Sequence, residues 1–473
     1  MPSLPHALKN RLVSRFGDRF SQVPAILDQH GRDESWHPTS PPDAVVFAET
    51  TEDVQVIMTA CAEHAVPVIP FGAGTSFEGH VAALFGGVSI DFSRMNRILA
   101  VRHADLDCTV EAGVTREQLN HHLRGDGLFF SVDPGANATI GGMVATRASG
   151  TNAVRYGTMR DVVLGLTVVL ADGQVIRTGG RARKSSAGYD LTRLFVGSEG
   201  TLGIVTDVTL KLYGIPEAIS SAVCPFADLP GAVNAVIAII QSGIPVARVE
   251  FLDELAIRAV NRHAKLSMAE QPTLFFEFHG SKASVAEHSE AVQAIVGEYG
   301  GADFQWATKQ EDRTRLWAAR HQAYWACVNQ RPGARGWPTD VCVPISHLAQ
   351  CVVETRRDLD RLPFPGVILG HVGDGNFHCV LALDPDNPEE RKAAERFNAD
   401  LVDRALAMEG SCTGEHGIGY GKQKFLEQEA GSSLQVMRAV KQALDPRGLL
   451  NPGKIFITPP TVNGRSNDQR DWS

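Results

Sequence analysis

The glycine-rich stretch Pro70-Phe71-Gly72-Ala73-Gly74-Thr75-Ser76-Phe77-Glu78-Gly79 begins at the last residue of an apolar run, Val66–Pro70. This apolar run is typical of a buried strand. Glycines let successive backbone N–H groups approach a ligand closely, and such groups together form a concavity that binds anions. The hydroxyls of Thr75 and Ser76 add donors, so a diphosphate group fits this loop. The spacing matches neither the G-x-G-x-x-G pattern of dinucleotide-binding domains nor the G-x-x-x-x-G-K-[ST] pattern of nucleotide triphosphatases.

Three further runs of small and hydroxyl-bearing residues follow along the chain. Ordinary turns between strands explain one or two such runs, but they explain four poorly. A long polar cofactor bound by several loops explains all four. The three runs are Pro134-Gly135-Ala136 with Thr139-Ile140-Gly141-Gly142, Ala148-Ser149-Gly150-Thr151-Asn152 with Arg155-Tyr156-Gly157, and Gly197-Ser198-Glu199-Gly200-Thr201-Leu202-Gly203-Ile204.

Composition limits the class of protein. The chain has 473 residues, 43% hydrophobic and 21% charged, which predicts two or three globular domains rather than a disordered chain. A net charge of −9 argues against a nucleic-acid partner, since phosphate neutralisation needs clustered Lys and Arg. No apolar run reaches the roughly 18 residues that predict a transmembrane helix. The eight cysteines form no C-x-x-C motif, which argues against a zinc ribbon, a c-type haem or an iron–sulfur cluster.

The N-terminal segment has an amphipathic pattern. Leu8, Leu12, Phe16 and Phe20 recur at every fourth position beside several arginines. We expect the first surface helix of a domain. A targeting segment or a membrane-surface anchor is the alternative.

We expect an α+β protein. Residues 1–220 alternate short strands, helices and turns, with a hairpin signal at Asp172-Gly173, and are predicted to form a cofactor-binding domain. Residues 221–410 combine longer helical patterns with strands and are predicted to form a second α+β domain. The turn-rich residues 411–458 are expected to pack back on the first domain. The polar residues 459–473 are expected to form a mobile tail.

A metal site is predicted from hairpin geometry. Apolar runs flank Asp374-Gly375, a preferred two-residue turn, and with this turn His371 lies directly opposite His378. Cross-strand neighbours on one face are close enough for two imidazoles to share an ion. The run Gly414-Glu415-His416-Gly417-Ile418-Gly419 supplies a carboxylate as third ligand. Two histidines and a carboxylate leave open positions, as catalytic zinc or manganese sites require.

A cation for a carboxylate group is expected on a helix over residues 313–324. Arg313, Trp317, Arg320 and Tyr324 would share one face of this helix. A guanidinium binds a carboxylate through two parallel hydrogen bonds. Lys422 and Lys424 are alternatives, although we expect both to be solvated.

The four glycine-rich runs resemble the FAD-binding domain of the vanillyl-alcohol oxidase type of flavoprotein. Further segments extend the resemblance over nearly the whole chain, to the FAD-dependent D-lactate dehydrogenases of the cytochrome-acceptor type. These segments are His30-Gly31-Arg32-Asp33-Glu34-Ser35, Thr339-Asp340-Val341-Cys342-Val343-Pro344, Gly370–His378, Gly414–Gly419 and Asn451-Pro452-Gly453-Lys454.

The resemblance implies a two-part FAD-binding domain, an α+β substrate (cap) domain and a C-terminal segment that returns to the FAD domain. It implies a divalent metal, zinc or manganese, on His371, His378 and Glu415, and catalytic roles for His416, the base, and Arg320, beside the substrate carboxylate. No histidine lies between Pro70 and Gly79, although His80 is adjacent, so we expect non-covalent FAD. The implied FAD-binding residues are Pro70, Gly72, Ala73, Gly74, Thr75, Ser76, Pro134, Gly135, Thr139, Gly142, Ser149, Gly150, Asn152, Glu199, Gly203, Ile204 and Asn451.

The expected function is metal-assisted oxidation of D-lactate, or a similar small D-2-hydroxy acid, to the 2-oxo acid, with hydride transfer to flavin N5. No second redox centre is evident, so electrons are expected to pass to an external acceptor, a cytochrome or a quinone. Alternatives are a D-2-hydroxyglutarate or glycolate dehydrogenase of the same fold, a metallohydrolase, and a non-catalytic flavin-binding subunit. We expect a cytoplasmic protein, or a mitochondrial one in a eukaryote; contact with the inner membrane and a homodimer stay open.

Overall fold

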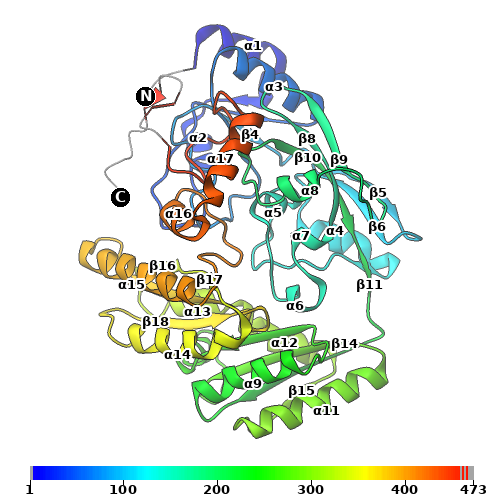
Figure 1. Ribbon diagram of the computed structural model, residues 1–473, viewed down its shortest axis with the longest axis vertical. Coiled ribbons are helices and arrows are strands. Elements are labelled where there is room, and N and C mark those ends of the chain that lie inside the picture. The colour runs from blue at the N-terminus through cyan, green and yellow to red at the C-terminus, as the bar shows by residue number, and fades with distance from the viewer. Residues whose placement is uncertain (1–3, 459–460, 463–464, 467–473) are drawn as a thin grey trace. The chain divides into compact units, whose positions relative to one another are not determined.

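A computed structural model describes residues 4–458, 461–462 and 465–466 of the chain (Figure 1). The chain divides into two compact units. Unit 1 comprises Met1–Ala148, Thr158–Gly214 and Glu415–Ser473, and unit 2 comprises Ser149–Gly157 and Ile215–Gly414. Much of the predicted tail, residues 459–473, lies outside the described residues. Within it, β20 (Thr461–Val462) pairs with β21 (Arg465–Ser466).

Unit 1 contains a four-stranded sheet and a five-stranded sheet. In the first, of order β1-β2-β4-β3, the last three strands are parallel. The second is antiparallel, of order β5-β6-β10-β8-β9, and the predicted hairpin at Asp172-Gly173 joins β8 to β9. The strands are β1 (Phe20–Ser21), β2 (Ala44–Phe47), β3 (Val68–Phe71), β4 (Val88–Asp91), β5 (Ile98–Arg102), β6 (Asp107–Glu111), β8 (Val163–Val169), β9 (Val175–Gly179) and β10 (Ile204–Lys211), with a separate pair, β7 (Leu128–Phe129) and β11 (Tyr213–Gly214).

Helices pack against both sheets of unit 1. The apolar sides of α1 and α3 share one core with β2 and β4, and a second core lies between the five-stranded sheet and α4, α5, α7 and α8. The helices are α1 (His6–Phe16), η1 (Gly17–Arg19), α2 (Pro24–His30), α3 (Thr51–Glu63), α4 (Arg116–Leu123), η2 (Arg124–Asp126), α5 (Ile140–Thr146), α7 (Met159–Val162), α8 (Leu191–Phe195), α16 (Gln423–Ala430) and α17 (Ser433–Leu444).

The C-terminal segment is part of unit 1. Leu450 forms a parallel bridge with Val68 of β3, so this segment pairs with the strand that precedes the first glycine-rich loop. Asn451 lies next in sequence, and its backbone N–H donates to the Val68 carbonyl at 2.9 Å.

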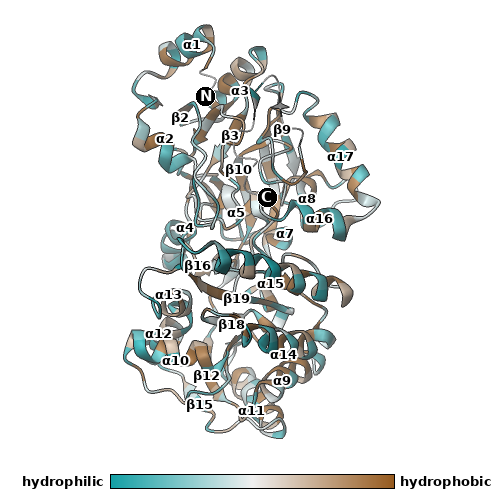
Figure 2. Cartoon of the chain, turned by 90° about the vertical axis from the view of Figure 1, so that its left-hand side faces the viewer, coloured by the Kyte–Doolittle hydropathy of each residue, from teal (hydrophilic) through white to brown (hydrophobic). Residues whose placement is uncertain are grey.

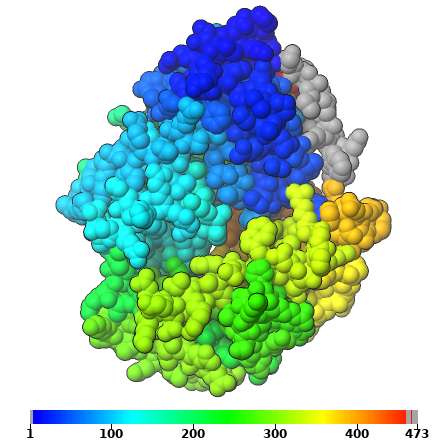
Figure 3. Space-filling view, turned by 180° about the vertical axis from the view of Figure 1, so that it is seen from behind, coloured from blue at the N-terminus to red at the C-terminus, as the bar shows by residue number. Residues whose placement is uncertain are grey.

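The N-terminal helix buries its apolar side in unit 1. Leu8 and Leu12 are fully buried, and Phe16 is 2% exposed. The helix ends at Phe16, and Phe20 already belongs to β1. Dark-blue N-terminal residues lie at the molecular surface in Figure 3. The prediction of a surface helix is confirmed, because its apolar stripe packs on the core of its own domain.

Unit 2 is built on one antiparallel sheet of eight strands, of order β15-β12-β14-β13-β18-β19-β16, with β17 also paired to β19. Its apolar strands contrast with the polar outer sides of α14 and α15 (Figure 2). The strands are β12 (Ala218–Pro225), β13 (Arg248–Leu252), β14 (Thr273–Gly280), β15 (Gln305–Ala307), β16 (Arg335–Pro338), β17 (Val341–Cys342), β18 (Gly366–Gly370) and β19 (Asn376–Leu383).

One face of this sheet packs against α10, α12 and α13. In the described part of the chain, no helix has the length and apolar character that a membrane span requires. The helices of unit 2 are α6 (Ala153–Tyr156), α9 (Leu229–Gln241), α10 (Glu254–Ala264), α11 (Lys282–Glu298), α12 (Gln310–His321), α13 (Ala323–Val328), η3 (Ile345–His347), α14 (Leu348–Leu359), η4 (Val372–Asp374) and α15 (Pro388–Ala407).

Replacing Leu12 by alanine should destabilise unit 1 by about 2–5 kcal/mol, because the change removes a fully buried side chain and leaves a cavity. Val13, one residue further along the same helix, is 42% exposed, and Val13→Ala should change stability by less than about 0.5 kcal/mol. Chemical denaturation followed by fluorescence measures both variants. Equal stability of Leu12→Ala and the parent protein would contradict the packing of α1.

Candidate functional site

The loop after β3 offers a row of backbone donors. In the described part of the chain, no acceptor takes the amide N–H groups of residues 72–76, and these residues are half-buried or exposed. Gly74 has a φ of +67°, a conformation that favours glycine. Ser76 is held by its hydroxyl, which donates to Asp33 at 2.9 Å. The arrangement suits an anion with several oxygens, as predicted for the diphosphate of a dinucleotide.

The second glycine-rich run meets the first at Thr139. The hydroxyl of Thr139 accepts from the N–H of Gly142 at 3.3 Å, and a Cβ on Gly72 would collide with the same oxygen. A Cβ on Gly142 would meet only this oxygen, and a Cβ on Gly135 would meet nothing within 4 Å. The backbone at these glycines therefore faces open space that a ligand can enter. Pro134 precedes Gly135 in the same half-buried loop.

The remaining predicted FAD residues fall into two groups. A Cβ on Gly200 would collide with the ring of Pro70, so the turn after Glu199 lies against the start of the first loop. Gly203 packs on Val168, and Ile204 begins β10. These residues belong to unit 1, as do Ala73 and Thr75. Ser149, Gly150 and Asn152 belong to unit 2.

Glu199 anchors the loop that carries His416. Its two carboxylate oxygens accept from the backbone N–H groups of Ile418 at 2.7 Å and Gly419 at 2.8 Å, and one oxygen lies 3.3 Å from Nε2 of His80. Burial opposes ionisation of Glu199, but His80 and the two N–H donors outweigh it and lower the pKa of the carboxyl. Burial likewise disfavours the His80 cation, and Glu199 reverses this and raises the pKa of His80.

Asn451 joins the same loops. Its side-chain amide donates to the carbonyls of His80 at 3.0 Å and Glu199 at 2.9 Å. Both Glu199 and Asn451 were predicted to bind FAD, and these hydrogen bonds are made within the chain itself.

His416 is 8% exposed and lies in the same anchored loop. The centroid of its ring lies 4.8 Å from that of Phe77, with the two rings tilted by 36°, and its Nδ1 lies 3.9 Å from the carboxylate of Glu78. Both partners come from the first glycine-rich loop. Glu78 also lies 3.6 Å from the ammonium group of Lys422, which is 3% exposed. The prediction that Lys422 is solvated is therefore wrong, because the lysine pairs with a buried carboxylate, whereas Lys424 is exposed.

In unit 2, the hairpin that carries the two predicted histidine ligands has another register than predicted. Leu369, not His371, lies opposite His378. The turn is longer than Asp374-Gly375, because it contains η4 and closes at Gly375, whose carbonyl accepts from the N–H of Val343 at 3.0 Å. The predicted register is wrong by two residues. An even shift keeps both histidines on one face, because side chains alternate with a period of two.

The two imidazoles lie close together, with ring centroids 5.6 Å apart at an angle of 84°. Nδ1 of His371 donates to Glu250 at 2.7 Å, and Nδ1 of His378 donates to the carbonyl of Thr339 at 3.0 Å. Both acceptors lack a proton to give, so in each neutral ring the lone pair is on Nε2. This is the usual arrangement of histidines that bind a metal through Nε2.

Glu415 completes the predicted ligand set. It directly follows Gly414, the last residue of unit 2, and its carboxylate and the two imidazoles offer ligand atoms within 4.8 Å of one another. Asp340 holds the peptide just before it, since its carboxylate accepts from the hydroxyl of Thr413 at 2.6 Å and the N–H of Gly414 at 2.8 Å. Two imidazoles and a carboxylate suit zinc or manganese.

Arg320 is 8% exposed and pairs with Glu250, which is fully buried. Nε and Nη2 of the guanidinium lie 2.9 Å and 2.7 Å from the same oxygen of Glu250, and among the described residues no acceptor takes Nη1. The helix is shorter than predicted, because α12 ends at His321 and Tyr324 belongs to α13. Burial opposes ionisation of Glu250, but His371 and Arg320 outweigh it and lower its pKa.

A second buried cluster lies on the neighbouring strand β14. Glu277 accepts from Ser221 at 2.9 Å and from His279 at 2.8 Å, and lies 3.5 Å from the guanidinium of Arg248. Arg248 in turn donates to the side-chain oxygen of Asn152 at 2.9 Å. Sequence analysis missed Glu250, Arg248 and Glu277. Their signal is a charged side chain within an otherwise apolar strand, which demands a buried partner.

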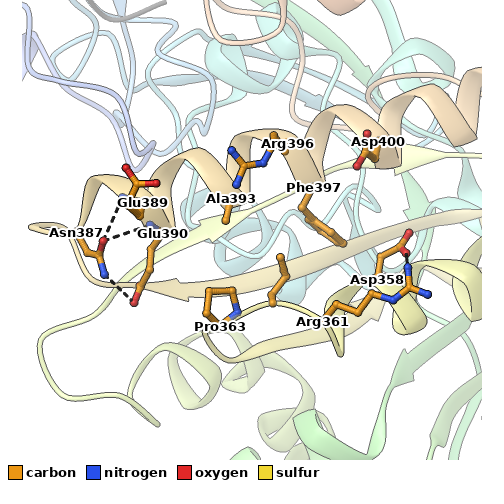
Figure 4. Close-up of a pocket in the computed structure, with 11 residues that line it drawn as sticks. Asp358, Arg361, Pro363, Asn387, Glu389, Glu390, Ala393, Arg396, Phe397 and Asp400 are labelled. Atoms are coloured by element: carbon orange, nitrogen blue, oxygen red, sulfur yellow. Dashed lines mark hydrogen bonds and ion pairs between the residues drawn. The ribbon is translucent and has the colours of Figure 1, made fainter.

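A hollow on unit 2 lies elsewhere. It has a volume of about 630 Å³ and lies between α15 and the end of α14, where Arg361, Arg396, Phe397 and several carboxylates line it (Figure 4). None of the residues predicted to bind FAD, metal or substrate lines it.

Comparison with known proteins identifies the class of protein to which this chain belongs. The model of the FAD-binding domain matches residues 42–179, and the model of the C-terminal domain of FAD-linked oxidases matches residues 215–455. The solved structure of p-cresol methylhydroxylase with bound substrate covers 96% of this chain and 98% of its own, with a TM-score of 0.79 and 20% identity. The predicted α+β fold of the vanillyl-alcohol oxidase type is confirmed.

Curated relatives are more similar in sequence. The probable mitochondrial D-lactate dehydrogenase of Danio rerio is 52% identical over 95% of this chain and 92% of its own length. The mitochondrial D-lactate dehydrogenase [cytochrome] of Arabidopsis thaliana is 48% identical over 96% of this chain and 79% of its own length. The chain belongs to the FAD-linked oxidases, and the resemblance found from the sequence is confirmed.

Glu277 should make the stability of unit 2 depend on pH. Burial would raise the pKa of this carboxyl, but Arg248 and His279 lower it to about 2. The unfolded carboxyl titrates near 4.3, so the ionised group contributes on the order of 3 kcal/mol above that pH, and this is lost as pH falls towards 2. Glu277→Gln should therefore be less stable than the parent at pH 7, and the gap should shrink as pH falls below about 4.5.

Thermal unfolding at a series of pH values measures this difference. Glu389→Gln is the control, because the side chain of Glu389 is 75% exposed, and its small effect should not vary with pH. A stability gap for Glu277→Gln that stays constant from pH 7 to pH 3 would contradict the pairing.

Proposed function

We propose that this protein oxidises D-lactate, or a similar small D-2-hydroxy acid, to the 2-oxo acid. FAD would be bound non-covalently, and one divalent ion, zinc or manganese, would be bound by His371, His378 and Glu415. The observation that carries the proposal is this cluster, in which two imidazoles and a carboxylate offer ligand atoms within 4.8 Å of one another, in a chain closely similar to proteins named D-lactate dehydrogenase.

The first loop fits the diphosphate of FAD. The amide N–H groups of residues 72–76 find no acceptor among the described residues, so they remain available for phosphate oxygens. The open space at Gly135 and Gly142 supports the approach of the rest of the cofactor to the backbone. When bound, FAD supplies the two-electron acceptor that receives hydride from the substrate carbon.

The ligand set fits a divalent ion by its chemistry. An ion bound there supplies a Lewis acid that lowers the pKa of the substrate hydroxyl. The chain contributes by fixing both imidazoles through Nδ1 and by fixing the peptide before Glu415 through Asp340. These contacts hold the metal-binding side chains in one orientation before an ion binds.

His416 is proposed to accept the hydroxyl proton of the substrate. It is the next residue after Glu415, so the Cα atoms of the two residues are about 3.8 Å apart, which supports a role for His416 next to the proposed ion. A neutral imidazole suits this role, because its ordinary pKa lies close to physiological pH. Phe77 and the anchored backbone of Ile418 and Gly419 hold the ring.

Arg320 is proposed to bind the substrate carboxylate. Glu250 occupies Nε and Nη2, and Nη1 remains as a donor. Nη1 could therefore donate to a substrate carboxylate while Arg320 stays paired with Glu250. Electrons would then pass from the reduced flavin to an external cytochrome or quinone.

The substrate is tested by anaerobic mixing of the purified yellow protein with D- and L-2-hydroxy acids. D-lactate should bleach the flavin absorbance fastest, and L-lactate should not bleach it. D-2-hydroxyglutarate and glycolate separate the alternative dehydrogenases from the proposed one. A protein that neither contains nor takes up FAD would refute the proposal.

Replacing His416 by alanine should lower the rate of flavin reduction by D-lactate roughly 10²–10⁴-fold, the usual effect of losing a general base. Added imidazole should restore part of the rate, because it replaces the lost base. Flavin and metal content serve as controls, since both should match the parent protein. Rapid flavin reduction by the variant would assign the proton transfer to another residue.

A further inference from the structure

We propose that Glu250 is a positioning residue that fixes the imidazole of His371 and the guanidinium of Arg320 simultaneously. Ion affinity and recognition of the substrate carboxylate would then depend on one buried carboxylate. The inference rests on the proposed function of these two partners and extends it to a residue that contacts neither ion nor substrate.

Glu250 lies in the interior of the sheet, out of contact with solvent. The residue lies on β13, which is bordered by β14 on one side and β18 on the other, and it is fully buried. Its side chain shares the sheet face with Leu252 and Phe275, which pack against α10 and α12. An unpaired carboxylate in such surroundings would lower the stability of the fold by several kcal/mol, so Glu250 must be paired.

The two oxygens of Glu250 serve different partners. Oε1 accepts from Nδ1 of His371 at 2.7 Å, Oε2 accepts from Nε of Arg320 at 2.9 Å, and Nη2 of Arg320 forms an ion pair with Oε2 at 2.7 Å. The first contact fixes the tautomer of His371, with the lone pair of the neutral ring on Nε2. The second orients the guanidinium and leaves Nη1 as a donor. Both partners donate, so only a group with two acceptor oxygens satisfies both.

An amide cannot replace this carboxylate. Glutamine has one acceptor oxygen, and its NH₂ group would face a donor, either the N–H of His371 or the guanidinium of Arg320. Aspartate keeps two acceptor oxygens, but its side chain is shorter by one methylene group. We expect Glu250→Asp to keep part of the effect of Glu250 and Glu250→Gln to lose most of it.

Glu277 supplies a matched control. It lies on the adjacent strand β14, is 5% exposed, and pairs with an arginine and a histidine, as Glu250 does. Its partners are Arg248 and His279, which are not proposed ligands of the ion. Glu277→Gln therefore removes the same charge from the same sheet without touching His371 or Arg320.

The test measures Mn²⁺ binding to the FAD-containing protein after removal of metal with a chelator, with free Mn²⁺ followed by electron paramagnetic resonance. Glu250→Gln should weaken Mn²⁺ binding roughly 10–100-fold, the usual effect of losing the outer partner of a histidine ligand. Glu277→Gln should stay within about twofold of the parent. At saturating Mn²⁺, Glu250→Gln should also raise KM for D-lactate more than it lowers kcat, because Arg320 has lost its orientation.

The outcomes separate two failures. If the parent and Glu250→Gln bind Mn²⁺ equally, the positioning role is wrong and the proposed function stands. If the parent turns over D-lactate without binding Mn²⁺ or Zn²⁺, the metal part of the proposed function fails, and the inference fails with it. If Glu250→Gln does not fold, Glu250→Asp decides, since unchanged Mn²⁺ affinity and KM in that variant would also overturn the inference.

Discussion

Buried carboxylates that must be paired hold the predicted site residues in place. Glu199 holds the backbone after His416, Asp340 holds the peptide before Glu415, and Glu250 holds His371 and Arg320. Each of these carboxylates is at most 5% exposed, so water cannot replace a missing partner. The penalty for an unpaired buried charge is several kcal/mol. The hydrogen bonds that the loops donate to these carboxylates therefore stabilise the observed positions of the loops.

This arrangement also explains why the site tolerates glycine-rich backbone. Gly417 has a φ of +81°, and a Cβ there would lie 2.8 Å from Glu199 and 2.9 Å from His80. The loop that carries His416 thus needs glycine to reach its carboxylate anchor. In the first loop the need is different, because the amide N–H groups of residues 72–76 find no acceptor among the described residues and are proposed to bind the diphosphate of FAD. Glycine thus permits close packing in one loop and would permit the approach of a ligand in the other.

Much of the fold was predictable, because it depends on local patterns. The strand that leads into Gly72, the hairpin at Asp172-Gly173 and the apolar stripe of α1 each follow from periodicity and turn chemistry. The pairing of His371 with His378 was predicted with the wrong register. The two rings still came out as neighbours, because an error of two residues preserves the face of a strand. Turn length was not predictable, since Gly375 bonds to Val343, more than thirty residues earlier in the chain.

The sequence by itself identified the glycine-rich loops, the two histidines and the Glu415-His416 pair as candidate site residues. The chemistry of these residue types can be recognised before the fold is known. Only the tertiary structure decided which groups support them. The apolar neighbours of Glu250 in its strand indicate that it needs a buried partner, but the partner is identified only when β13 is placed beside β18 and α12 brings Arg320 against it. The same holds for Lys422, whose partner Glu78 is distant in sequence. Partners of buried charges come from remote segments, and only folding brings those segments together.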